Sequence, residues 1–385
     1  MITNAWQEGD FRFGHGDVLT FNDTGTGGGG ARAVTLSSLV TPGSVIFDNS
    51  TSTYTVSGTG NMVGPSGLSK SGSGAVTLSN ANSYTGGTTV TAGTLTTGSA
   101  TALGSTSGQL TVNGGTLDMG SQSITVGNLT GTGGVISGTS GTRTLTIGQG
   151  NTGGGNYQGS IQNGASGTTA LAKNGTGTLT LSGINTYTGA TTVTGGTLLV
   201  NGNISTSSLT TVKTGATLGG NGTVGALTVE ANGIVAPGNS PDTLDVNGAY
   251  NQLGIYQAEI TAKTVGNGTT GYDQISVAGT VNITGGSLVT IFSGTGYVAN
   301  DLIFILLNDS TDAITGTYAT FAQDAVVTTF GGLSWKISYN ADSVANTFTG
   351  TPNGNDIALM AIPEPNVASL IGALGGILLL RRRRG

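Results

Sequence analysis

The chain has 385 residues, of which 71 are glycine, and only 8% of its residues are charged. Such sparse charge together with 36% hydrophobic residues excludes a chain held open by charge repulsion and leaves enough apolar material for a sizeable core. The formal net charge of −6 disfavours nucleic acid as a partner, and the lack of cysteine excludes disulfides and thiolate metal sites.

The N-terminal stretch, residues 1–67, is richer in aromatic side chains than the chain that follows. These side chains are Trp6, Phe11, Phe13, Phe21 and Phe47. Stacked structures leave apolar surface at their ends, so we predict that this stretch is an N-terminal β cap. Residues 1–10 lack the basic start and apolar run of a secretory signal, and we therefore expect a truncated start with an export segment upstream.

A repeated segment begins at residue 68. Residues 68–95 return without a gap as residues 171–198, with 18 of 28 positions identical. Both copies contain Lys-x-Gly-x-Gly, Thr-Leu-Ser, Tyr-Thr-Gly and Thr-Thr-Val-Thr. Repetition of this kind is typical of stacked units, each of which buries its hydrophobic face against a neighbouring unit.

Short strands are predicted through the whole of residues 68–250. Apolar and hydroxyl side chains alternate there, for example over residues 178–181, at the two-residue period of a half-buried strand. Gly-Gly, Asn-Gly and Gly-Thr-Gly sequences between the strands supply tight corners. The pattern predicts an all-β chain whose central part is a right-handed parallel β-helix, with successive coils about 4.8 Å apart.

Residues 251–360 follow a less regular pattern. Their larger side chains and longest apolar run are Tyr256, Tyr272, residues 302–307, Trp335 and Tyr339. We predict that this region is a C-terminal β cap domain that closes the stack.

The last segment, residues 361–385, combines a polar motif, an apolar run and a cluster of arginines. The motif consists of Pro363, Glu364 and Pro365, and the uncharged run covers residues 367–380. The apolar residues of the run are Val367, Leu370, Ile371, Leu374, Ile377, Leu378, Leu379 and Leu380, and the arginines are Arg381, Arg382, Arg383 and Arg384. Because apolar side chains enter hydrocarbon and arginines resist crossing it, we predict a short apolar helix with a cytoplasmic stop.

The apolar run is short for a membrane-spanning helix. Its 14 residues span about 21 Å, less than the roughly 30 Å of a hydrocarbon core. Length alone also suits a buried core helix, but the adjacent arginines fit poorly inside a core. We therefore expect a transient or tilted anchor in the inner membrane.

The repeat and the tail each resemble a known family. Residues 68–95 and 171–198 resemble the passenger-associated transport repeat, also called the autotransporter-associated β-strand repeat, which occurs on parallel β-helical surface proteins. The tail, with Pro363, Glu364 and Pro365 before the apolar run and the arginines, resembles the PEP-CTERM sorting signal of Gram-negative surface proteins. The second resemblance implies an exosortase-type processing protease as a partner.

Candidates for catalysis are few. His15 is the only histidine, so a Ser-His-Asp arrangement would depend on it. Asp242, Asp245 and Asp273 could supply the paired carboxylates of glycoside hydrolysis, although acidic residues in turns are usually solvated. Two Gly-x-Gly-x-x-Gly matches open no recognisable helix and do not indicate a nucleotide site. We predict no catalytic residue, no cofactor and no metal ligand.

Threonine pairs suggest a binding surface. They occur in Thr89-Val90-Thr91, Thr144-Leu145-Thr146, Thr178-Leu179-Thr180 and Thr192-Val193-Thr194. Rows of hydroxyls on a flat face could organise water or meet sugar hydroxyls. The alternative is that outward strand positions are polar and that threonine suits strands.

The sequence thus predicts a non-enzymatic, exported protein of the cell surface or extracellular matrix that serves as a structural or adhesive element. Extracellular polysaccharide is a candidate partner. The alternatives are a polysaccharide-binding or ice-binding solenoid and a β-helix enzyme that degrades polysaccharide.

Overall fold

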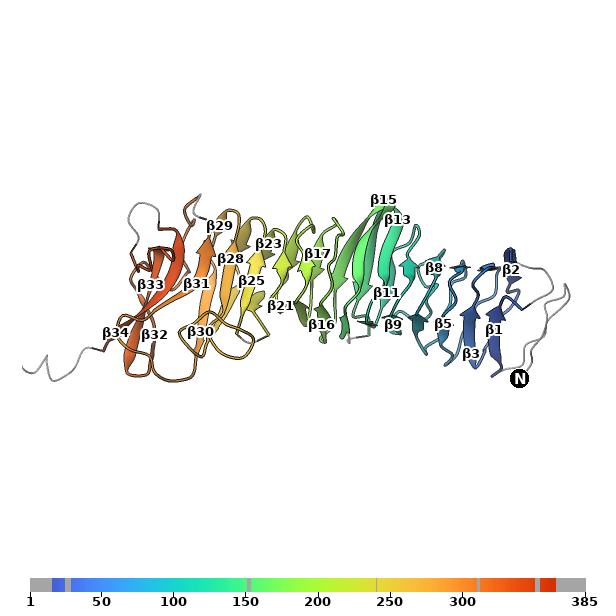
Figure 1. Cartoon of the computed structure of the whole chain (residues 1–385), viewed down its shortest axis with the longest axis horizontal. Helices are drawn as coiled ribbons and strands as arrows, with labels where there is room; N and C mark the ends of the chain where they lie inside the picture. The colour runs from blue at the N-terminus through green and yellow to red at the C-terminus, as the bar shows by residue number, and fades with distance from the viewer. Residues whose placement is uncertain are drawn as a thin grey trace, which may run out of the picture.

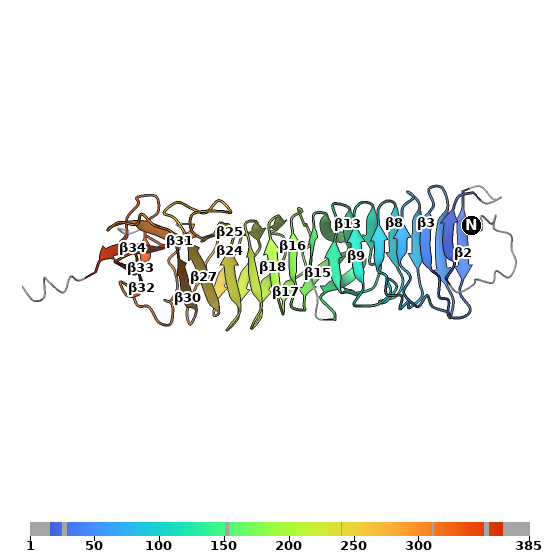
Figure 2. The ribbon, with the colours of Figure 1, turned by 90° about the horizontal axis from the view of Figure 1, so that it is seen from below.

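The computed structural model describes residues 16–24, 29–150, 154–239, 241–309, 312–349 and 354–364. These residues form 34 β-strands and no helix. The strands wind into an elongated solenoid whose coils follow one another along its axis (Figure 1). Seen from a direction at right angles, the strands lie across the axis in successive rows (Figure 2). The prediction of an all-β parallel solenoid is therefore confirmed.

The first face of the solenoid consists of two runs of parallel strands. A bridge between Gly131 and Tyr157 joins the runs. In order along the axis, the strands are β1 (Val18–Asn22), β3 (Ser44–Asp48), β5 (Leu68–Lys70), β7 (Thr88–Val90), β9 (Gln109–Val112), β12 (Asn128–Thr130), β14 (Gly155–Tyr157), β16 (Thr178–Leu181), β18 (Thr197–Val200), β21 (Thr217–Gly220), β24 (Ile234–Pro237), β27 (Ile255–Ile260) and β30 (Ser287–Phe292).

The second face is built in the same way. Its two runs meet where the Ser160 hydroxyl donates to the carbonyl of Ile184, which in turn bridges to Asn203. The strands are β2 (Ala31–Thr35), β4 (Thr53–Ser57), β6 (Ala75–Leu78), β8 (Thr94–Thr97), β10 (Thr116–Asp118), the first halves of β13 (Val135–Ile147) and β15 (Ser160–Lys173), β19 (Asn203–Ile204), β22 (Thr223–Val224), β25 (Thr243–Val246), β28 (Gln274–Val277) and β31 (Leu302–Asn308).

The third face is irregular in the first coils and regular in the later ones. In the first coils it is an irregular wall, in which Val40 bridges Met62 and the Ser83 amide donates to the Met62 carbonyl. From the middle of the chain it is a regular sheet of β11 (Ile124–Val126), the second halves of β13 and β15, β17 (Thr191–Val193), β20 (Thr210–Val212), β23 (Leu227–Val229), β26 (Tyr250–Gln252) and β29 (Val281–Asn282).

The stack of coils is longer than the predicted range 68–250. Parallel pairing begins at β1 and continues to β31, where the chain changes to antiparallel pairing. The last strands, β32 (Val326–Phe330), β33 (Leu333–Ala341) and β34 (Asp356–Pro363), extend the second face in the order β31-β34-β33-β32. Trp335 of β33 is fully buried beneath them.

One continuous apolar column fills the interior. Leu179, Leu198, Leu218 and Val235 are paired in register on successive strands of the first face, and none of the four side chains is exposed. Full burial of such a side chain contributes about 1.5–3 kcal/mol relative to exposure. A single coil cannot bury these side chains, so the column stabilises the chain only as a stack.

The predicted apolar helix is not observed, because residues 365–385 lie outside the described part of the chain. Within the described part, no helix has the length and apolar character needed to cross a bilayer.

Close stacking requires glycine at certain corners. Gly131 has φ +149°, and a Cβ there would lie 1.8 Å from the Val112 carbonyl oxygen of the previous coil. Gly285 also has a positive φ, +85°, but a Cβ there would meet no atom within 4 Å.

We expect Gly131→Ala to lower the free energy of unfolding by more than Gly285→Ala does. The second substitution should cost only the left-handed backbone penalty of about 1–2 kcal/mol, whereas the first must also displace a backbone carbonyl. Chemical denaturation of the two variants measures the difference. Equal costs would show that the coils are not packed this closely at Gly131.

Candidate functional site

The two repeat copies bury the same lysine. The Lys70 and Lys173 side chains are both fully buried. The Lys173 ammonium donates to the carbonyls of Asn174, Gly175 and Gly195 at 2.7, 3.1 and 2.9 Å, and the third of these belongs to the next coil. Lys70 donates in the same way to Gly72 and, across to the next coil, to Ala92. Each lysine therefore joins two successive coils.

Each copy also buries a tyrosine with a threonine partner. The Tyr84 hydroxyl lies 2.7 Å from that of Thr88, and the Tyr187 hydroxyl lies 2.7 Å from that of Thr191. The Thr88 hydroxyl also donates to the Leu103 carbonyl at 3.1 Å. Burial raises the pKa of both tyrosines well above the ordinary value, so they stay neutral.

A buried asparagine completes the set in each copy. The Asn82 side chain accepts from the Met62 amide and donates to the Ala102 carbonyl, on coils before and after its own. The Asn185 side chain accepts from the Ile161 amide and donates to the Asn203 carbonyl. Lysine and asparagine thus form a set of polar coil ties, which satisfy backbone groups that the strands leave unpaired at the corners, whereas each tyrosine bonds a threonine hydroxyl of its own copy.

The two copies occupy different faces. Leu68 and Lys70 belong to β5 on the first face, whereas Leu171 and Lys173 belong to the second half of β15 on the third face. The change follows from β11 and from the long strands β13 and β15, which give each later coil a third regular strand. The repeat is therefore a coil-joining unit, and it does not create one uniform binding face.

This shift separates the threonine pairs that the sequence analysis selected. Thr89 and Thr180 point outward from the first face, whereas Thr146 and Thr192 lie on the third face. Thr194 donates to the Lys173 carbonyl at 3.3 Å and so serves the coil contact. The selected pairs therefore lie on two faces and do not form one flat surface, because the repeat copies occupy different faces.

Of the three candidate carboxylates, Asp242 and Asp273 are neighbours, whereas Asp245 lies on a separate strand. Asp273 is buried and accepts from the backbone amides of Asp242 and Glu259, at 3.1 and 2.9 Å, with one oxygen each. Burial raises the pKa of Asp273 to about 7, and the two amide hydrogen bonds oppose the rise. Asp245 is exposed on β25. Asp273 therefore anchors backbone, and no cluster of three metal-ligating side chains occurs among the described residues.

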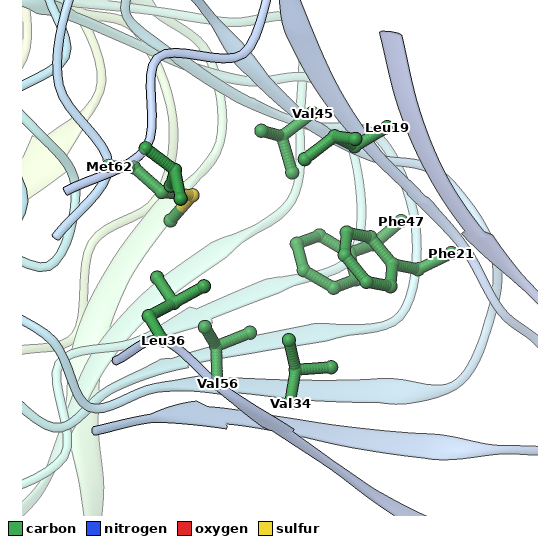
Figure 3. Close-up of a pocket in the computed structure, with 9 residues that line it drawn as sticks. Leu19, Phe21, Val34, Leu36, Val45, Phe47, Val56 and Met62 are labelled. Carbon is green, nitrogen blue, oxygen red and sulfur yellow. The ribbon is translucent and has the colours of Figure 1, made fainter. Parts of the chain in front are cut away.

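A small apolar hollow of about 10 Å³, the size of a single water molecule, lies in the core of the first coils. Phe21 and Phe47 stack in it with ring centroids 4.6 Å apart, and Leu19, Val34 and Met62 help to form its wall (Figure 3). All its lining residues are apolar, so the hollow offers no group for catalysis or for a polar ligand. The N-terminal cap predicted for residues 1–67 stays a prediction. His15, the candidate for a Ser-His-Asp arrangement, lies outside the described part of the chain.

The structure describes only the beginning of the predicted sorting motif. Pro363 is the last residue of β34, and both it and Glu364 are exposed. Pro365, the apolar run and the four arginines lie outside the described residues.

Comparison with known proteins confirms the repeat resemblance. The passenger-associated-transport-repeat model matches residues 68–96 and 171–200. The chain is 40% identical over 144 residues to the adhesin BmaC autotransporter of Brucella suis biovar 1 (strain 1330), which is 37% of this chain and 4% of that protein. It is 39% identical over 87 residues to an extracellular serine protease of Serratia marcescens, which is 23% of this chain and 8% of that protein. The matches thus cover small parts of much longer relatives.

We expect Lys173→Met to reduce the free energy of unfolding by about 1–3 kcal/mol, because three backbone carbonyls lose a charged donor. Lys213→Met is the matched control. Lys213 pairs with Glu230 at the surface, and such pairs contribute roughly 0.2–1 kcal/mol.

The cost of Lys173→Met should also depend on pH. Burial lowers the pKa of Lys173 to about 8, whereas the unfolded side chain keeps the ordinary 10.5. Between these values the unfolded state binds the proton more strongly, so the stabilising contribution of Lys173 rises with pH. Denaturation at pH 7 and pH 9.5 should show a larger cost at pH 9.5, and equal costs would contradict a buried, desolvated ammonium.

Proposed function

We propose that the chain is a non-enzymatic, secreted or surface-displayed protein whose solenoid is a rigid structural or adhesive element. The observation that carries the proposal is the stacking of parallel coils from β1 to β31, in which one sheet pairs continuously from β2 to β29, reinforced by polar coil ties at both repeat copies. This construction makes a long, stiff body. The repeat match and the likeness to a protein named as an autotransporter adhesin support surface display.

Structural roles of the polar residues support the absence of catalysis. Both carboxylate oxygens of Asp273 are engaged by backbone amides, and the buried lysines are engaged by carbonyls. These contacts give Asp273 and the lysines a part in holding the fold together, which favours a structural role for them. The relative that is named as a serine protease shares only 87 aligned residues with this chain.

The tail is proposed to direct the chain to the envelope as a PEP-CTERM-type signal. In this scheme residues 367–380 enter the inner membrane transiently, the four arginines stay in the cytoplasm, and an exosortase-type protease processes the motif at Pro363, Glu364 and Pro365. The exposure of Pro363 and Glu364 at the end of β34 supports the scheme, because a protease can reach these two residues.

We expect deletion of residues 365–385 to move the protein out of the membrane fraction of the producing cells. The deletion leaves every described strand intact, so the solenoid should still fold. The matched control replaces the same residues with a glycine-serine segment of equal length, which should behave like the deletion. Fractionation and immunoblotting provide the measurement, and unchanged membrane association of both variants would contradict the proposed address.

A further inference from the structure

A two-file array of threonines covers part of the second face. Its outward positions on β4, β6, β8 and β10 are mostly threonine, and they form two columns side by side. We define the threonine array as Thr53, Thr55, Thr77, Thr94, Thr96 and Thr116.

The pairing register of the strands sets the positions of the array threonines relative to one another. Thr55, Thr77 and Thr96 are directly paired on successive coils, and Thr94 is paired with Thr116 in the parallel file. Neighbouring strands lie about 4.8 Å apart, and alternate residues of one strand lie about 6.8 Å apart. Threonine is stiff at χ1, so the grid is held without much loss of side-chain freedom on binding. Figure 2 shows the order of β2, β8 and β13 along the axis.

The array hydroxyls are not used within the protein. Among the described residues, none of the six hydroxyls makes a side-chain hydrogen bond, whereas on the first face Gln109 donates to both Thr111 and Thr130 and these two hydroxyls lie 3.0 Å apart. The Thr111 and Thr130 hydroxyls thus satisfy each other. The array hydroxyls can donate to and accept from a ligand.

The charge and the residue types of the threonine array indicate which class of partner can bind to it. Its four strands carry no outward basic residue, and their one outward acidic residue, Asp118, ends the array and accepts from Thr139. A neutral face without lysine or arginine does not attract acidic polymers or anionic lipid. It also lacks the aromatic and arginine anchors that dominate protein interfaces. Single neutral hydrogen bonds contribute only about 0.5–1.5 kcal/mol, so a ligand must engage many at once.

We propose that the threonine array is the docking surface for an uncharged polysaccharide that lies flat across the coils. Such a polymer presents repeated hydroxyls, which match a repeated set of free donors and acceptors. The proposal deepens the adhesive role proposed above and rests on it for its biological setting. Binding by the purified chain, however, does not depend on the sorting tail.

The test measures retention of the purified full chain on microcrystalline cellulose, the insoluble neutral probe, by a depletion isotherm. The double variant Thr77→Val/Thr96→Val removes two hydroxyls and keeps the β-branched shape, and we expect its partition constant to fall at least tenfold. The matched control Thr89→Val/Thr180→Val removes two outward hydroxyls of the first face and should stay within twofold of the wild type. Equal thermal midpoints confirm that all three proteins are folded.

Several results would overturn the proposal. They are a wild-type chain that cellulose does not retain, an array variant that binds as well as the wild type, and an equal loss in the control. Thermal hysteresis abolished by the array variant, without cellulose retention, would identify ice as the matching surface instead. Any of these results would leave the tail-directed display intact, because the fractionation of the 365–385 deletion measures that role separately.

Discussion

Register between successive coils is the constraint on which the rest of the structure depends. A strand of three or four residues has too little surface to be stable alone, and its inward side chains are buried only when the next coil places its own apolar residues directly above them. Leu179, Leu198 and Leu218 show this arrangement on the first face. A shift by one residue would turn every inward side chain outward, so register and core are one property.

Buried polar groups secure that register. An apolar column alone would tolerate a shift of one coil by two residues, which keeps apolar side chains facing inward. A hydrogen bond does not tolerate such a shift, because it has a fixed partner. Lys173 bonds to Gly195 on the next coil, and Asn185 bonds to Ile161 and Asn203 on the coils to either side. Their cost is the burial of polar atoms, and full pairing offsets it. The lysine and asparagine that both repeat copies share have a physical reason, since each of them bonds to a specific group on a neighbouring coil.

The sequence was sufficient to predict the parallel solenoid, because the two-residue alternation and the repeat both survive in the chain as local patterns. It was not sufficient to predict which face each strand joins. The change of phase arises at β13 and β15, where the register shifts between Gly138 and Ser140 and each strand continues from the second face to the third. The selected threonine pairs therefore lie on two faces, while the array on β4 to β10 was not selected. Burial of Asp273 was also missed, since it depends on amides of residues 31 and 14 positions away in the chain.

Spin-label distances test the stacked register most directly, and the chain lends itself to them because it contains no native cysteine. Thr89 and Thr180 are four coil steps apart in the outward column of the first face, and Thr89 and Ala236 are seven steps apart. Stacking at about 4.8 Å per step predicts backbone separations of about 19 Å and about 34 Å, each with a narrow distribution. Broad distributions, or separations that do not increase in proportion to the number of coils, would contradict the solenoid as the basis of this protein.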